Sequence, residues 1–505
     1  MLFFSYEYIF AFLPLAVVGY FWLARRRLTV AAQAWLVFCS LFFYSWGRVE
    51  FLPVILVSIL FNYAVGSSLK RGGDGGNGTR LLAFGILGNL AGLAWFKYTD
   101  WAIANINLAT GTHIAAWHLA LPLGISFFTF QQIAYLVDTR RGLARERHFL
   151  DYCLFVTFFP QLVSGPIVHH TEMMTQFARL RNMTVHWRNI AHGGVIFTIG
   201  LAKKVIIADT LAVWATSGFD KAPELNIVEG WVTSLCYSMQ LYFDFSGYMD
   251  MALGAALLFN IRLPINFDSP YKAVSIQDFW RRWHMTLSRF LRDYLYVPLG
   301  GNRKGEPRAL GNLMVVFLLG GLWHGAGWTF VFWGFLHGLA STVHRVWTRL
   351  GGRLPVVAAW LVTFLFVNFA WVFFRAKEWA DATRVIKAMF GMGAPLGGLY
   401  PSGALAHLGP TPEVMQNLGK LVGLLMHRPG TTLTDLGVAA APYVMLVLLL
   451  ASTLACAVAP NSHAIAARFR PTLRGAWGWG LALGAIALYV VMDRNRVTEF
   501  IYFGF

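Results

Sequence analysis

Long hydrophobic runs recur along almost the whole sequence, and short polar or basic connections separate them. A helix needs ~20 mainly apolar residues to cross the hydrocarbon core of a bilayer, and several runs reach or approach that length. The runs are continuously apolar, whereas the strands of a membrane β-barrel alternate between apolar and polar positions. We expect spans at residues 6–23, 30–46, 51–69, 81–96, 119–137, 190–211, 230–259, 310–323, 328–347, 356–374, 443–458 and 477–492. The pattern predicts an all-α polytopic membrane protein with about 11 transmembrane helices.

Two stretches depart from this pattern. Residues 152–168 contain Pro160 and Pro166, so we do not expect a straight helix there. Broken backbone at membrane depth must be buried in protein or line a cavity. In residues 276–298 aromatic and leucine side chains alternate with arginines, which is typical of an amphipathic or re-entrant helix at the basic face. Residues 391–436 are rich in glycine and proline, and their structure stays open.

Composition agrees with a membrane protein, and charge indicates how it is oriented. Of the 505 residues, 57% are hydrophobic and 13% are charged, far from the balance of a soluble domain. The net charge of +17 would suggest a nucleic-acid partner in a soluble protein. Here the lysines and arginines cluster between hydrophobic runs, as the positive-inside rule describes. Part of this charge could also attract a polyanionic cytosolic substrate such as a phosphorylated cofactor.

Several charged residues lie inside predicted spans, and four of them bear on the fold. Lys203 and Lys204 suggest an interior cavity or a helix end from which the side chains reach the interface. Asp244 and Asp250 share the span at residues 230–259 but point about 120° apart around a helix. We therefore do not expect these two aspartates to form one carboxylate pair.

His324 lies in residues 318–338, which are mainly apolar, aromatic or glycine. An imidazole in a membrane span is a functional hypothesis, and the alternative is a core or interfacial histidine bonded to a neighbour. Gly321 and Gly325 have the spacing that permits close helix packing, and they could also leave room for a substrate. If this stretch were a single helix, His337 would point about 140° away from His324. We interpret His337 as structural.

The second histidine of interest is His284, whose simplest interpretation is an interfacial histidine beside arginines. The usual motifs of serine hydrolases, zinc proteases, nucleotide-driven pumps and dinucleotide-binding domains are missing from the sequence. The four cysteines are scattered, without ligand spacing. They are typical of small buried hydrophobic residues, and we predict no metal site.

Several motifs together resemble the membrane-bound O-acyltransferase (MBOAT) family, and within it the bacterial branch that includes the alginate O-acetylation membrane protein. They are YFDFSGYMD at 242–250, RLP at 262–264, NFD at 266–268, and residues 275–301 and 318–338, with further similarity at 121–138 and 158–166. The block FWRRWHMTLSRFLRDYLYVPLGGNRKG is the most specific of these. The resemblance covers an MBOAT-like core at about 121–345, within one integral-membrane domain of residues 1–505.

The resemblance implies a helical bundle around a central tunnel, with acyl-CoA arriving from the cytosol and an acceptor hydroxyl from the other side. His324 matches the principal catalytic histidine of the family. His284 matches a second motif position, which holds Asn or Asp in many eukaryotic relatives, so we expect it to orient or polarise. The chemistry agrees, because a neutral imidazole can take the proton of a hydroxyl that attacks a thioester, typically contributing ~10²–10⁴-fold.

Basic residues of the same block could contact the phosphates of coenzyme A. They are Arg281, Arg282, Arg289, Arg292, Arg303 and Lys304. The alternative is that these residues only follow the positive-inside rule.

The sequence thus predicts an O-acetyltransferase in a bacterial inner membrane. It would move acetyl groups from cytosolic acetyl-CoA, a substrate and not a resident cofactor, toward an extracytoplasmic polysaccharide. Alginate is the first expectation, and a periplasmic acetyltransferase partner would complete the transfer. The alternatives are peptidoglycan, cellulose or a lipid as acceptor, or a non-enzymatic component of polysaccharide export.

Overall fold

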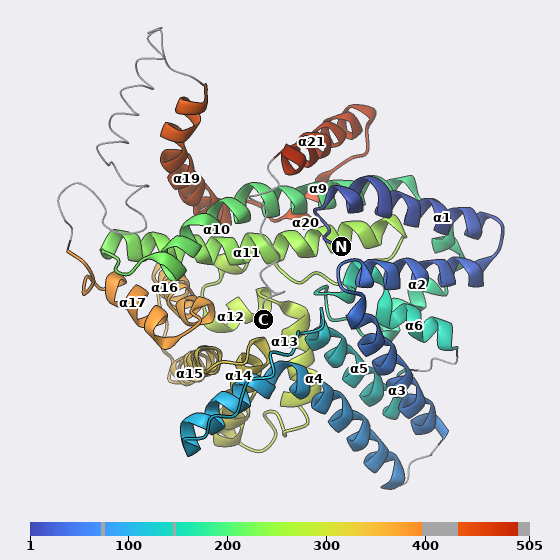
Figure 1. The fold of residues 1–505 in the computed structure, drawn as a ribbon, viewed down its shortest axis with the longest axis horizontal. Coiled ribbons are helices and arrows are strands. Elements are labelled where there is room, and N and C mark those ends of the chain that lie inside the picture. Colours follow the sequence, from blue (N-terminus) through green and yellow to red (C-terminus); the bar gives the residue numbers. More distant parts are fainter. Residues whose placement is uncertain (72–75, 145–147, 396–432, 493–505) are drawn as a thin grey trace.

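The computed structural model describes residues 1–71, 76–144, 148–395 and 433–492, and every regular element in these ranges is a helix (Figure 1). The predicted all-α fold class is therefore confirmed. The N-terminal part contains η1 (Tyr8–Phe12), α1 (Leu13–Arg25), α2 (Thr29–Ser45), η2 (Val49–Phe51), α3 (Leu52–Arg71), α4 (Gly76–Thr110) and α5 (Ile125–Arg140).

The middle of the chain combines short broken helices with long ones. These are α6 (Phe149–Thr157), α7 (Phe159–Leu162), α8 (His170–Phe177), η3 (Leu180–Met183), α9 (Trp187–Ala202), η4 (Lys203–Ala208), α10 (Asp209–Thr216), η5 (Ser217–Lys221) and α11 (Ile227–Leu258). After these come η6 (Pro270–Lys272), α12 (Ile276–Arg282), α13 (Met285–Leu291), η7 (Arg292–Tyr296), α14 (Glu306–His324) and α15 (Trp328–Arg349). The last elements are α16 (Val356–Arg375), α17 (Trp379–Met389), α19 (Leu433–Val458), α20 (Ser462–Arg468) and α21 (Leu473–Met492).

The helices α9 and α11 form a closely packed pair, which Figure 1 shows running across the molecule. Glycines make the close approach possible. A Cβ atom on Gly200 would lie 2.6 Å from the carbonyl oxygen of Gly247, and one on Gly193 would lie 2.7 Å from that of Gly254. Small residues of this kind let the backbones of membrane helices touch.

Ion pairs neutralise the charges where η4 and α10, which follow α9, lie against α11. Lys203 Nζ lies 2.7 Å from Asp250, while Lys204 Nζ lies 2.7 Å from Asp209 and 3.0 Å from Asp244. The two aspartates of α11 therefore bind different lysines, which confirms that they are not one carboxylate pair. Lys204 is only 1% exposed, so it pairs inside the protein and does not reach toward the interface.

The segment with two prolines is broken, as predicted. It forms the short helices α6 and α7 followed by a loop up to α8, and almost all of its residues are buried. Gly124, at the start of α5, has φ +68°, and a Cβ there would lie 2.6 Å from the carbonyl oxygen of Val163. This irregular backbone is thus enclosed by protein, as the membrane environment requires.

Four helices among the described residues are by themselves long and apolar enough to cross a bilayer, and a bent pair at 446–468 adds a fifth if it is counted as one span. With the other apolar helices they make a multi-pass membrane protein. The helix α4 extends to Thr110, well beyond the expected end of its span at residue 96. The hydrophobic run ends at Lys97, whose side chain binds the end of α14.

Candidate active site

His324 is the last residue of α14, and a short turn at residues 325–327 leads into α15. The two helices form a hairpin, so residues 318–338 are not the single helix on which the predicted angle between the histidines depended. Gly321 allows the close contact, because a Cβ there would lie 2.3 Å from the carbonyl oxygen of Phe330 in α15. A Cβ on Gly325 would also meet the ring of Phe330, at 2.2 Å.

The hairpin brings His337 back toward His324. The Trp333 ring centroid lies 5.2 Å from that of His324 and 4.8 Å from that of His337. The indole Nε1 of Trp280 donates a hydrogen bond to His337 Nδ1 at 3.2 Å, and the His337 side chain is fully buried. These contacts fit the packing role that we predicted for His337, although it lies beside the site and not away from it.

His284 lies between α12 and α13 with φ 45° and ψ 51°. The left-handed region is uncommon for a residue with a side chain, and it often marks a functional position. The stretch that we predicted as an amphipathic or re-entrant helix is therefore two short helices that meet at this histidine. The bend buries His284 completely.

The side chain of Asn266 orients His284. Its Oδ1 accepts hydrogen bonds from the backbone N–H and the hydroxyl of Thr286, at 3.1 and 3.0 Å, and lies 3.2 Å from His284 Nδ1. A carbonyl oxygen only accepts, so Nδ1 must carry the hydrogen and Nε2 of the neutral ring is left as an acceptor. The loop containing Asn266 thus fixes both the direction and the tautomer of His284.

The two imidazoles are buried neighbours. Their ring centroids lie 6.5 Å apart, and the exposed fractions of His284 and His324 are 0% and 4%. Phe245 contacts the His284 ring edge to face at 4.9 Å, and Phe374 contacts the His324 ring at 5.1 Å. The structure therefore brings together the two histidines that the sequence singled out, inside an aromatic cage.

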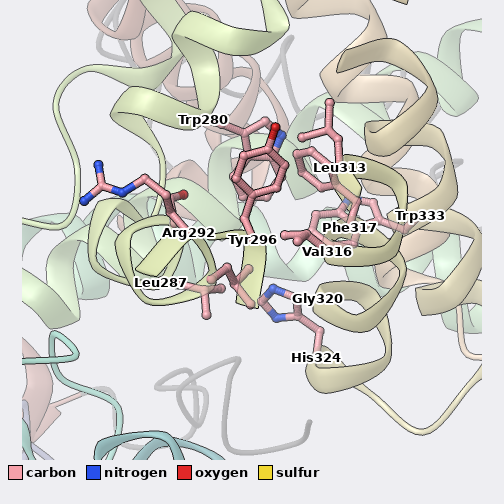
Figure 2. Close-up of a pocket in the computed structure, with 12 residues that line it drawn as sticks. Trp280, Leu287, Arg292, Tyr296, Leu313, Val316, Phe317, Gly320, His324 and Trp333 are labelled. Carbon is pink, nitrogen blue, oxygen red and sulfur yellow. The ribbon is translucent and has the colours of Figure 1, made fainter. Parts of the chain in front are cut away.

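A narrow cavity of about 190 Å³ ends at His324. In Figure 2 the His324 imidazole lies at one end of the labelled side chains, beside Gly320, and Trp280 lies toward the other end. We call this cavity the slot, and it is lined by Trp280, Leu287, Ser288, Leu291, Arg292, Tyr296, Leu313, Val316, Phe317, Gly320, His324 and Trp333. A Cβ on Gly320 would meet only Leu291, at 3.6 Å, so this glycine keeps the slot wide beside the imidazole.

The slot adjoins a larger cavity of about 1110 Å³, which we call the vestibule. Six residues line both cavities: Trp280, Ser288, Arg292, Tyr296, Leu313 and Phe317. We call the two adjoining cavities the funnel, because arginines line the vestibule while His324 and mainly apolar side chains line the slot.

Three of the predicted coenzyme A contacts line the vestibule, namely Arg281, Arg289 and Arg292. The other three do not. Successive residues of a helix point about 100° apart, so Arg282 does not face the vestibule with its neighbour Arg281. Its Nε donates to Asp278 Oδ1 at 2.9 Å. Arg303 and Lys304 are exposed in the turn before α14.

Two vestibule arginines of α15 were missed by the sequence interpretation, Arg345 and Arg349. They lie at the C-terminal end of an apolar helix, so their only local explanation was the positive-inside rule. Folding the α14–α15 hairpin turns them toward the arginines of α12 and α13.

Acidic residues offset part of the positive charge of the vestibule. Arg289 pairs with Glu172 at 2.6 Å, and Glu306 accepts from Arg345 at 2.6 Å and from Arg349 at 2.8 Å. The hydrogen bond from Arg345 holds the pKa of Glu306 below its ordinary value. Within the described chain Arg281 has no ion-pair partner, which leaves a guanidinium at the mouth that can bind an anion.

Lys97 of α4 is a further residue at the site that sequence reasoning missed. Its Nζ donates to the backbone carbonyls of Trp323 and His324, at 2.6 and 3.0 Å. The sequence shows Lys97 directly at the end of a hydrophobic run. It does not show that the lysine binds Trp323, which lies more than two hundred residues further along the chain.

Residues 79–377 match the model of the membrane-bound O-acyltransferase family (MBOAT). A peptidoglycan O-acetyltransferase of Helicobacter pylori is 52% identical over 415 residues, which cover 76% of this chain and 79% of that protein. A probable alginate O-acetylase of Pseudomonas aeruginosa is 38% identical, over 78% of this chain and 75% of that protein. A teichoic acid D-alanyltransferase of Bacillus subtilis is 29% identical over 50% of this chain and 69% of that protein.

Proposed function

Because the chain belongs to the membrane-bound O-acyltransferase family, we propose that it moves acetyl groups from cytosolic acetyl-CoA to an acceptor hydroxyl on the way to an extracytoplasmic polymer, with His324 as the general base. The chain is an O-acetyltransferase that acts on extracellular polymers. We propose the identity of the acetyl donor, of the catalytic residues and of the polymer. The observation that carries the proposal is the funnel, which begins among arginines and ends at His324.

The shape and charge of the funnel suit acetyl-CoA. The phosphates of coenzyme A would bind guanidinium groups at the vestibule, above all Arg281, because charge-assisted contacts from arginine suit phosphate. The thin pantetheine arm would then lie along the apolar slot and bring the thioester to His324. The positive-inside rule places the basic mouth on the cytosolic side, where acetyl-CoA is made.

The proposed reaction balances without an additional reagent. The acceptor hydroxyl oxygen attacks the thioester carbonyl carbon, a carbon–oxygen bond forms and the carbon–sulfur bond breaks. His324 takes the hydroxyl proton during the attack and returns it to the thiolate sulfur of the leaving group. The products are an acetyl ester and coenzyme A as its thiol.

The tautomer of His284 favours one of its two expected roles. With the hydrogen on Nδ1 bound to Asn266, Nε2 of the neutral ring can accept a hydrogen bond but cannot donate one to the thioester carbonyl. We assign His284 to orienting the acceptor hydroxyl beside His324, and not to polarising the carbonyl.

For the polymer, peptidoglycan becomes the first candidate. The Helicobacter pylori peptidoglycan O-acetyltransferase is 52% identical to this chain, against 38% for the Pseudomonas aeruginosa alginate O-acetylase. Alginate, the first expectation from the sequence, stays the second candidate on the strength of that 38% relative. In both cases we expect this chain to lie in the inner membrane and a periplasmic acetyltransferase partner to complete the transfer.

A direct test uses the purified protein in lipid vesicles with radiolabelled acetyl-CoA. His324→Ala should abolish release of coenzyme A and transfer of label to a hydroxyl acceptor, while His113→Ala, at an exposed loop position, should leave both unchanged. Full turnover by folded His324→Ala protein would remove His324 from the mechanism. Acetate measured in isolated peptidoglycan and in secreted polymer from a deletion strain then decides between the two acceptors.

A further inference from the structure

Lys97 and Tyr98 of α4 bind the end of α14 that carries His324. The Lys97 ammonium donates to the carbonyl oxygens of Trp323 at 2.6 Å and His324 at 3.0 Å, and the Tyr98 hydroxyl donates to that of Leu322 at 2.8 Å. Three consecutive carbonyl groups of one helix end are therefore bound by two consecutive residues of another helix.

The third donor of the ammonium also has an acceptor. Ser126 Oγ of α5 lies 3.4 Å from Lys97 Nζ, and the ring of Trp323 lies beneath the ammonium with its centroid 5.9 Å away. The lysine thus contacts α5 and α14 at once. A cation is costly beside a hydrophobic span unless protein groups solvate it, and here backbone carbonyls do so.

From this geometry we propose that Lys97 is a positioning residue, which holds His324 at the inner end of the slot. The inference rests on the proposed role of His324 as the base. Lys97 binds the backbone carbonyls at the end of α14 and is not among the residues that line the slot or the vestibule, so we expect it to act through His324 and not on the substrate.

The physical reason lies in how α14 ends. The last four carbonyl groups of a helix have no partner within the helix, and a cation beside them is favourable because of the helix dipole. After His324 the chain continues through two glycines, Gly325 and Gly327, which restrain the backbone little. Without Lys97 the last turn of α14 would be free to fray, and the imidazole would move with it.

Small displacements of a catalytic group are expensive. A misplacement of about 1 Å can cost on the order of 10²-fold in rate. Lys97 belongs to α4, which contributes no residue to the lining of the vestibule, so loss of Lys97 should spare the binding of acetyl-CoA. The expected signature is a fall in kcat with little change in KM, with kcat expressed per amount of folded protein from size-exclusion chromatography. This normalisation removes the fall in apparent kcat that a general loss of folded protein would produce.

The test compares purified variants in vesicles with acetyl-CoA as the varied substrate. Lys97→Met, which keeps the length of the side chain without its donors, should lower kcat by on the order of 10–100-fold and leave KM for acetyl-CoA within about twofold. Lys97→Arg, which keeps the donors, should recover most of the rate. Tyr98→Phe should lower kcat by a smaller factor.

Lys272 supplies a matched control, because its Nζ also donates to a backbone carbonyl, that of Ala459, at 2.6 Å. Lys272→Met should leave kcat unchanged. Unchanged kcat in Lys97→Met, a rise in KM that accounts for the loss, or an equal loss in Lys272→Met would overturn the proposal. If His324→Ala is inactive while Lys97→Met keeps full kcat, only this inference fails. If His324→Ala is active, the proposed function fails as well.

Discussion

The Oδ1 atom of Asn266 lies 3.2 Å from Nδ1 of His284 and thereby determines which ring nitrogen faces the site. The same oxygen accepts two hydrogen bonds from Thr286, and the backbone carbonyl of Asn266 accepts from the N–H of Met285 at 3.0 Å. One residue thus holds His284 in a left-handed conformation that its own local sequence would not choose.

Asn266→Ala should therefore impair catalysis more than binding of the donor. Loss of a partner that orients a functional histidine typically costs ~10–100-fold, and buried donors left without an acceptor cost about 1–3 kcal/mol of stability each. The measurement is kcat for acetyl-CoA turnover, normalised to folded protein from size-exclusion chromatography. Asn266→Asp keeps an acceptor oxygen and should retain more activity, and equal activity of Asn266→Ala and the unmodified protein would contradict the assignment of His284.

The width of the slot beside His324 depends on Gly320. Gly320→Ala should be tolerated, because the new Cβ would make only ordinary contact with Leu291, at 3.6 Å. Gly320→Leu should fill the slot and reduce turnover to background while the protein remains folded. Gly311→Leu serves as the control on the same helix, since a Cβ at Gly311 meets nothing within 4 Å. Turnover by Gly320→Leu at the normal rate would show that the thioester reaches His324 by another route.

The neighbouring glycine should behave in the opposite way, through stability and not through access. A methyl group at Gly321 would lie 2.3 Å from the Phe330 carbonyl oxygen, which forces α14 and α15 apart. Overpacking of this kind typically costs about 1–3 kcal/mol. Thermal unfolding, monitored by size-exclusion chromatography, should have a lower midpoint temperature for Gly321→Ala than for Gly320→Ala. Equal midpoint temperatures would contradict the close contact of α14 and α15.

The adjacent arginines of α12 offer a paired test of donor recognition. Arg281→Gln should raise KM for acetyl-CoA by roughly 5–30-fold with kcat nearly unchanged, because the loss of a charge-assisted phosphate contact of about 1–2 kcal/mol weakens binding of substrate and transition state alike. Arg282→Gln should have little effect on KM, since Arg282 binds Asp278 outside the vestibule.

A shortened donor makes this test specific for the phosphates. With acetyl-pantetheine, which lacks the nucleotide, Arg281→Gln and the unmodified protein should share the same KM. An effect of Arg281→Gln that persists with the shortened donor would mean that the arginine does not bind a phosphate group.

Several features of this protein follow from the sequence alone. Continuous hydrophobic runs are a local property, and they predict the helices well even where polar residues, such as Lys203 and Asp250, lie inside them. His324 stands out because an imidazole among apolar and aromatic residues is costly in a membrane, whereas His284, beside arginines, stands out only through the family motifs. The motif-rich block around them indicates the family, which the family model and the relatives confirm.

Other features arise only when distant segments meet. The break at His284 depends on Asn266 in a preceding loop, because the sequence of α12 and α13 by itself favours one amphipathic helix. The vestibule gains Arg345 only because the α14–α15 hairpin folds back onto α12. Lys97 could be placed at the end of a hydrophobic run, but its partner carbonyl belongs to Trp323, far along the chain. Local chemistry therefore indicates the candidate reacting groups, while tertiary contacts determine their orientation, since backbone carbonyls and amide side chains carry no sequence signal of what they will bind.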